Sequence, residues 1–249
     1  MCSAPSQPAP GLSPAIERTL TDLVAQARAS LGDDLRSIVL FGSGAEGRLR
    51  ATSDLNVLFI LRRFAPASID PLREPLRLAH VAHRVAVMFL LEDELLEATE
   101  AFAVKFADIR RRHRVLWGEP LLADLVVAPA AQRRQLRQML LNLQLRLRER
   151  YAALSLREEQ LALVLAEAAG PLRVAASALL ELENQPAASP REALARLAVE
   201  LCAGDAESLL ALISDAREHR SLPPGEAAPA LLRLLALVAA LRTRLGTEA

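Results

Sequence analysis

The chain has 249 residues, of which 52% are hydrophobic and 3% aromatic, and its 30 basic and 30 acidic residues leave a formal net charge of zero. This length exceeds the usual size of one compact core, so we expect two domains. A zero net charge argues against the broad basic surface that binds DNA or RNA, and no nucleic-acid partner is expected. Leucine and alanine supply most of the hydrophobic content, which favours packed helices.

The number of cysteines and the length of the apolar segments predict the cellular compartment of the protein. Cys2 and Cys202 are too few for a disulfide framework or a metal site, which indicates a reducing environment. Residues 1–12 lack the basic start and apolar core of a signal peptide, so we expect a flexible tail. The apolar segments 161–182 and 230–245 are interrupted by charges and fall short of the ~20 apolar residues of a membrane span. We expect a cytoplasmic protein without a membrane partner.

The first predicted helix is marked at both ends. Ser13 is a typical N-cap, Pro14 suits the first turn, and Gly32 is a typical stop. Between them apolar residues recur every three or four positions, which indicates one apolar face. This helix is expected to pack on a sheet.

Two apolar runs, residues 37–41 and 55–61, predict buried strands because they are rich in β-branched and aromatic side chains. Between them lies Gly42-Ser43-Gly44-Ala45-Glu46-Gly47. Its glycines permit positive φ, so backbone N–H groups can form a concavity that binds a phosphate, with the Ser43 hydroxyl as a further donor. Asp54 begins the second strand, where a carboxylate beside phosphates could hold Mg²⁺. Together these features predict a nucleoside triphosphate site.

Two other glycine-rich motifs are excluded by their context. Gly42-x-Gly44-x-x-Gly47 matches the dinucleotide-binding fingerprint, but that motif opens the helix of a βαβ unit of ~30 residues. Here only the six residues 48–53 separate the last glycine from Asp54. A P-loop is excluded because no Gly-Lys-Ser/Thr sequence occurs, and Lys105 is the only lysine of the chain.

The remaining pattern is Gly42-Ser43, a glycine four residues after Ser43, and Ser53-Asp54-Leu55-Asn56, with Asp54 eleven residues after Ser43. It resembles the nucleotidyltransferase superfamily of polymerase-beta-like fold, which includes aminoglycoside nucleotidyltransferases and small bacterial proteins. The resemblance implies that Gly42 and Ser43 hold the triphosphate and that Asp54 and Asn56 are catalytic and bind Mg²⁺. Gly47 and Arg48 would complete the phosphate loop, although a loop arginine is more often solvated.

The resemblance extends over roughly residues 30 to 125. The apolar run 84–91 falls where the family places its third strand, and residues 109–118 resemble the family's closing segment. Helices are expected over 71–82 and 93–108. The first domain, residues 13–127, is therefore expected to be an α/β (α+β) nucleotidyltransferase core with a small mixed sheet.

Two departures from the family pattern concern charge. The second carboxylate is replaced by Asn56, and the third strand offers Val85, Ala86 and Val87 in place of an acid. If metal stabilisation is worth several kcal/mol of the barrier, losing much of it slows the reaction by roughly a thousandfold. Substitute acids have no motif support, and the candidates are Glu46, Glu92, Asp93 and Asp108.

After residue 127 the pattern is helical, and residues 129–249 are expected to form a bundle of five or six helices. The first would span 130–152. Capping boxes at Ser155-x-x-Glu158 and Ser189-Pro190-x-Glu192 predict two helix starts. Gly170-Pro171 and Gly204-Asp205 predict breaks, and a last helix is expected over 227–245. In the relatives such a domain closes over the nucleotide, but it could equally form a homodimer.

Two functions remain open from the sequence. One is a nucleotidyltransferase that moves a nucleoside monophosphate from a triphosphate, taken as ATP, to a hydroxyl of a small molecule or protein. The other is a catalytically impaired relative that senses nucleotides or contacts proteins. Asn56 and Ala86 favour the second on mechanism, whereas the superfamily's usual activity favours the first. In simpler interpretations Asp54 caps a turn, Asn56 is its polar neighbour, and Ser43 holds its own turn.

Overall fold

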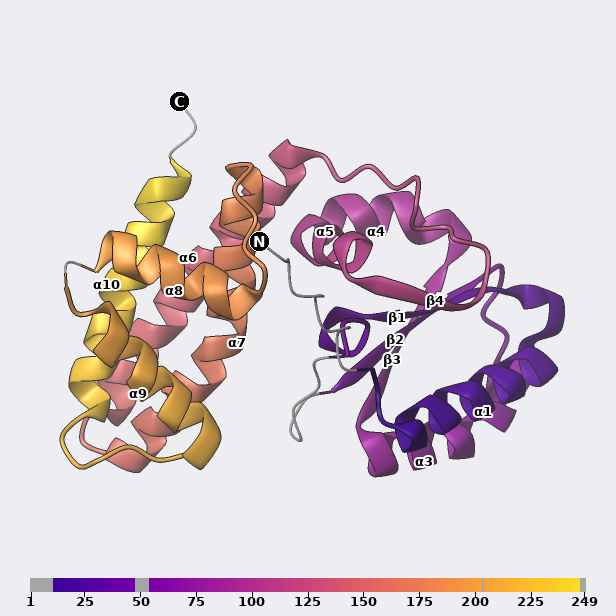
Figure 1. Ribbon diagram of the computed structural model, residues 1–249, viewed down its shortest axis with the longest axis horizontal. Helices are drawn as coiled ribbons and strands as arrows, with labels where there is room; N and C mark the ends of the chain where they lie inside the picture. Colours follow the sequence, from indigo (N-terminus) through magenta and orange to yellow (C-terminus); the bar gives the residue numbers. More distant parts are fainter. Residues whose placement is uncertain (1–10, 48–53, 203, 247–249) are drawn as a thin grey trace, which may run out of the picture. The chain divides into compact units, whose positions relative to one another are not determined.

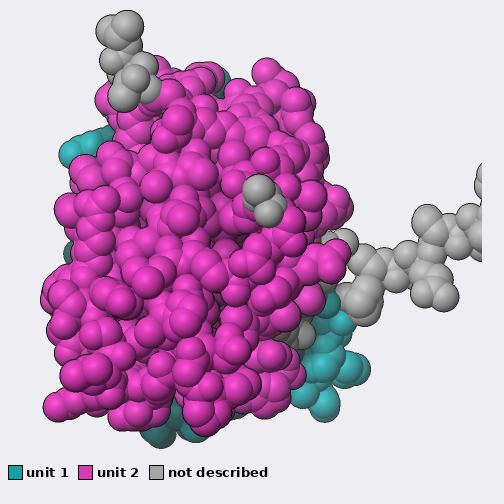
Figure 2. Space-filling view, turned by 90° about the vertical axis from the view of Figure 1, so that its left-hand side faces the viewer, with its two compact units in different colours: residues 1–127 teal, residues 128–249 magenta. Residues whose placement is uncertain are grey.

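A computed structural model describes residues 11–47, 54–202 and 204–246. The chain divides into two compact units, residues 1–127 and 128–249 (Figure 1, Figure 2). Each unit has its own core and is described separately.

The first unit is built on a four-stranded mixed sheet in the order β3-β2-β1-β4. Its strands are β1 (Leu35–Phe41), β2 (Leu55–Leu61), β3 (Val85–Leu91) and β4 (His113–Gly118). Strands β2 and β3 are parallel, whereas β1 is antiparallel to both β2 and β4. This confirms the expected small mixed sheet. Strand β4 is an additional finding, because its apolar run is short and flanked by polar residues.

Helices α1 (Pro14–Leu31) and α3 (Arg73–His83) cover one face of the sheet (Figure 1). The start of α1 is the predicted one, since the Ser13 hydroxyl accepts the N–H of Ile16 at 3.4 Å. Gly32, with φ of 50°, ends the helix as expected. The short helix α2 (Pro66–Ile69) and a 3₁₀ turn precede α3.

Helices α4 (Leu95–Ala101) and α5 (Ala103–Arg111) cover the opposite face (Figure 1). The sequence predicted one helix over 93–108, but the chain leaves helical geometry at Phe102, with φ of −118° and ψ of 42°. The break redirects the chain, so that α4 and α5 each bury their own apolar side chains against β1 and β2. Because these two strands are covered on both faces, most of their residues are apolar instead of alternating between apolar and polar.

The second unit contains five helices among its described residues: α6 (Pro129–Leu154), α7 (Glu158–Leu182), α8 (Pro190–Leu201), α9 (Ala206–His219) and α10 (Ala227–Leu245). Helix α7 is the most buried and packs against the other four. Its length and hydropathy would suit a membrane crossing, but 61% of its apolar window is buried within the unit, as in a core helix. The expected helical bundle is confirmed.

Two local predictions in this unit were wrong. Ser155 ends α6 instead of capping α7, whose N-cap is Arg157. Pro171 lies inside α7, so Gly170-Pro171 does not divide two helices. The proline lacks the N–H that would bond to Glu167 four residues earlier, but buried side chains on both sides of it hold the helix together. By contrast, the Ser189 hydroxyl accepts the N–H of Glu192 at 3.2 Å, as predicted.

Candidate functional site

The glycine loop continues directly from the end of β1. Gly42 has φ of 73°, and residues Gly42–Gly44 form a 3₁₀ turn. The N–H of Ala45 bonds to the carbonyl of Gly42 at 3.1 Å, and that of Gly47 to Gly44 at 3.2 Å. A Cβ on Gly44 would lie 2.7 Å from Leu55 Cδ1, so glycine lets the loop approach the start of β2. The remaining loop donors include the N–H groups of Ser43 and Gly44 and the Ser43 hydroxyl.

The sheet register brings the predicted polar residues to this loop. Asn56 lies opposite Phe41 on β1 and opposite Ala86 on β3. A Cβ on Gly42 would lie 3.8 Å from Asn56 Nδ2, and that nitrogen lies 3.5 Å from the carbonyl oxygen of Asp54. The structure therefore places Gly42, Asp54 and Asn56 together. It also places the neutral Ala86 beside Asn56, where the family resemblance led us to look for an acid.

Arg84 forms an ion pair with one oxygen of the Asp54 carboxylate. Its Nε lies 2.9 Å and its Nη2 2.8 Å from Asp54 Oδ1. Both side chains are about half exposed, so the pair contributes only ~0–1 kcal/mol to stability. Arg84 follows α3 in the left-handed conformation, with φ of 54° and ψ of 36°. That conformation costs roughly 1–2 kcal/mol for a residue with a Cβ, and glycine is the usual residue there.

A second arginine, Arg112, braces the loop from the position just before β4. The backbone oxygen of Arg112 accepts the N–H of Gly42 at 3.0 Å. Its guanidinium bonds twice to Asp108, at 2.8 and 2.6 Å, and lies 3.2 Å from Glu46 Oε2. Burial alone would lower the pKa of Arg112, but the hydrogen bonds and charges of Asp108 and Glu46 outweigh it and raise the pKa. The guanidinium therefore stays charged.

Lys105 adds a third cation close to the end of β1. Its Nζ lies 5.8 Å from the ring centroid of Phe41 and 3.2 Å from Met88 Sδ. Partial burial lowers the pKa of Lys105. By strand alternation, Asn56 shares this face of the sheet with Phe41.

The structure brings together some of the suggested substitute acids and separates others. Glu46 and Asp108 lie at the loop, but both are paired with Arg112. Glu92 and Asp93 follow the far end of β3, about 20 Å along the strand from its first residue. Glu92 instead pairs with Arg36 at 3.0 Å. Arg48, expected in the phosphate loop, lies outside the described residues.

The donor set does not fit a two-magnesium centre. Two metal ions need several carboxylates, whereas Asp54 is paired with Arg84, and Asn56 adds an amide without charge. Within the described ranges no group of three or more His, Cys, Asp or Glu side chains is arranged to hold a metal ion. The described residues therefore do not supply the ligands of a two-magnesium site.

Sequence reasoning missed both arginines. Arg112 had one usable signal, because it lies four residues after Asp108, a spacing that favours an ion pair on a helix. Arg84 had none, since its contact with Asp54 joins positions 30 residues apart. Only the parallel pairing of β2 and β3 places the residues before these strands side by side.

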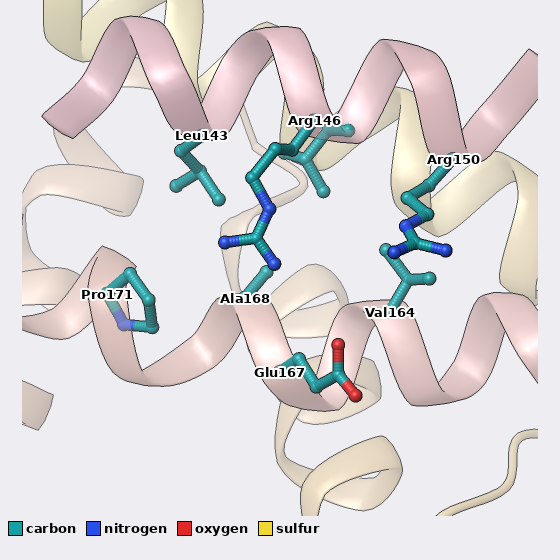
Figure 3. A pocket seen from close by; sticks show the side chains of 8 residues that line it. Leu143, Arg146, Arg150, Val164, Glu167, Ala168 and Pro171 are labelled. Atoms are coloured by element: carbon teal, nitrogen blue, oxygen red, sulfur yellow. The ribbon is translucent and has the colours of Figure 1, made fainter. Parts of the chain in front are cut away.

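A small cavity lies within the second unit, and the residues that line it do not include those of the candidate site. Figure 3 shows Arg146 and Arg150 of α6 reaching towards α7, which contributes Glu167. The cavity measures about 30 Å³. This volume admits only one or two water molecules, so it is not a substrate pocket.

Comparison with known proteins supports the assignment of the fold. No protein-family model matches the sequence, and neither does any curated protein. Among solved structures, the chain is similar to spectinomycin adenyltransferase AAD(9) from Enterococcus faecialis, with a TM-score of 0.63 and 13% sequence identity. The match covers 93% of this chain and 99% of the other, whose structure was determined with ATP and spectinomycin.

The chain has the nucleotidyltransferase fold. This confirms the expected architecture, a small mixed-sheet core followed by a helical domain. At 13% identity the similarity establishes the architecture, and the chemistry has to be argued from the side chains.

Proposed function

We propose that this nucleotidyltransferase-fold protein binds a nucleoside triphosphate at the Gly42–Gly44 turn, and that it transfers the nucleotide poorly or not at all. The observation that carries the proposal is the position of the turn beside Asp54 and Asn56. The fold supports it, because the similar adenyltransferase was crystallised with ATP. The Ser43 hydroxyl and the N–H groups of Ser43 and Gly44 are the donors we assign to the phosphates.

Impaired transfer is inferred from the missing negative charge. Asn56 and Ala86 are neutral, and Asp54 is paired with Arg84. Ions that stabilise charge developing on the α-phosphate would lack most of their ligands. We therefore assign the protein to nucleotide sensing or to nucleotide-dependent contact with a partner.

The test is calorimetric titration of the full chain with ATP, with and without Mg²⁺. Ser43→Ala should weaken binding several-fold, because one hydroxyl donor is lost. Thr21→Ala is the matched control, since it removes an exposed hydroxyl that bonds within α1, to Glu17. If wild-type protein binds no ATP in either buffer, the nucleotide assignment is wrong.

Transfer to a small-molecule hydroxyl is the second candidate function. It is favoured by the extent of the structural match, which spans both units of this chain. The similar protein was crystallised with spectinomycin as well as ATP. Incubation with α-labelled ATP, Mg²⁺ and spectinomycin tests it directly. Labelled spectinomycin above the enzyme-free background would support transfer over our first proposal, whereas ATP binding without transfer supports the first.

A further inference from the structure

We propose that the site binds the triphosphate as a metal-free polyanion and that Arg84 supplies the positive charge usually provided by metal ions. This inference rests on the proposed nucleotide binding. The register supports it, since Phe41 pairs with Asn56, and Leu55 pairs with Val85. Ser43, Asp54 and Arg84 therefore stand at one end of three neighbouring strands. Two strand spacings, about 10 Å, separate the outer backbones, so one phosphate chain can reach both Ser43 and the Arg84 side chain.

The backbone holds Arg84 in place from both sides. Its N–H bonds to the carbonyl of His80 at 2.7 Å, and its own carbonyl accepts the N–H of Leu55 at 3.1 Å. This anchors the left-handed residue between α3 and the first residue of β2. Glycine would adopt this conformation without strain. These two backbone bonds fix the point from which the Arg84 side chain extends, just before the start of β3.

The guanidinium has capacity for an anion. Two of its five N–H donors contact Asp54, and among the described residues no acceptor is assigned to the other three. Its side chain is 55% exposed, so a ligand can reach it. Asp54 orients the group through one carboxylate oxygen, and the free edge of the guanidinium can bind a phosphate in the paired geometry that arginine favours.

Among the described residues, acids do not outnumber bases around the loop, unlike in a metal centre. The contacts described above link three acids, Glu46, Asp54 and Asp108, and three bases, Arg84, Lys105 and Arg112, to the loop or to the strand ends beside it. A site built for two divalent cations needs an excess of acids. Here a metal ion at Asp54 would have to share the carboxylate with the Arg84 guanidinium, whose charge repels it, whereas a free polyanion would be attracted by that charge.

The experiment is titration of the full chain with ATP in EDTA and again in excess Mg²⁺. We expect binding in EDTA to be at least as tight as in Mg²⁺. Arg84→Gln should weaken binding in EDTA by about tenfold or more, because charge-assisted hydrogen bonds to phosphate are lost. Arg77→Gln is the matched control, since it removes a charge from the same helix, where Arg77 pairs only locally with Glu74. Its affinity should stay within about twofold of the wild type.

Arg84→Gly separates binding from folding. Glycine relieves the left-handed strain, so the melting temperature should not fall, while ATP binding in EDTA should weaken as it does in Arg84→Gln. A lower melting temperature together with unchanged ATP affinity would show that Arg84 is structural, which overturns the inference.

The two proposals fail in different ways. Absence of ATP binding by wild-type protein in both buffers overturns the proposed function. ATP binding that requires Mg²⁺, or that is equal in wild type and Arg84→Gln, overturns the metal-free inference and leaves nucleotide binding in place.

Discussion

The backbone oxygen of Arg112 accepts the N–H of Gly42 at 3.0 Å, and the Arg112 guanidinium reaches Glu46 in the same loop. The residue preceding β4 thus fixes both the entry and the far side of the candidate phosphate loop. Because Asp108 holds the same guanidinium with two bonds, the loop is braced by α5 as well.

Removal of this brace should destabilise the first unit. The Arg112 side chain is only 13% exposed, so Arg112→Met removes the cation that faces Glu46 and leaves Asp108 with its 3.2 Å contact to Arg111; it should lower the free energy of unfolding by about 2–3 kcal/mol. Arg114→Met is the control, since Arg114 and Glu17 are both about 40% exposed and their pair is worth ~0–1 kcal/mol. Urea unfolding measures both variants, and equal losses would contradict the bracing role.

Strands β1, β2 and β3 and the ends of α1 could be predicted from the sequence because their signals are local. Apolar runs bounded by glycine or by charged residues indicate strands, and Ser13 and Gly32 mark helix ends by their own backbone chemistry. The candidate phosphate loop could be singled out for the same reason, since Gly42 and Ser43 follow directly after a strand.

Features that depend on tertiary packing could not be predicted in this way. The break at Phe102 follows from the need of two short helices to bury separate faces, and the continuous α7 shows that buried side chains can outweigh Pro171. The Arg84–Asp54 pair depends on strand pairing, which single-sequence patterns leave open. The local motif therefore identified the fold better than the charges of the site.

The close approach of Gly44 to β2 predicts a coupled pair of substitutions. Gly44→Ala places a methyl group against Leu55 Cδ1 and should cost about 1–2 kcal/mol of unfolding free energy. Leu55→Val shortens that side chain and by itself costs about 1 kcal/mol. The double variant should lose less than the sum of the two, because the clashing atom is gone. Strict additivity in urea unfolding would show that the contact does not constrain the loop.

The proline inside α7 predicts a stabilising substitution. Pro171 is exposed and interrupts the hydrogen bonding of a continuous helix, so Pro171→Ala should raise the unfolding free energy of the second unit by about 1–3 kcal/mol. Pro190→Ala is the control, because Pro190 begins α8, where proline costs nothing. Urea unfolding followed by circular dichroism measures the free energy of unfolding of both variants. A loss of stability in Pro171→Ala would mean that the helix requires a distortion at this point.

The neutral residue at position 56 predicts a change in metal dependence. Asn56→Asp adds a carboxylate two residues from Asp54, so free ATP should bind about tenfold more weakly in EDTA because of repulsion. Mg²⁺ should restore the affinity, since two carboxylates beside phosphates form a better cation site. Asn142→Asp adds the same charge at an exposed position on α6 and should leave both measurements unchanged. If Asn56→Asp binds ATP equally in EDTA and in Mg²⁺, position 56 does not face the phosphates, and the loop geometry assigned to the nucleotide is wrong.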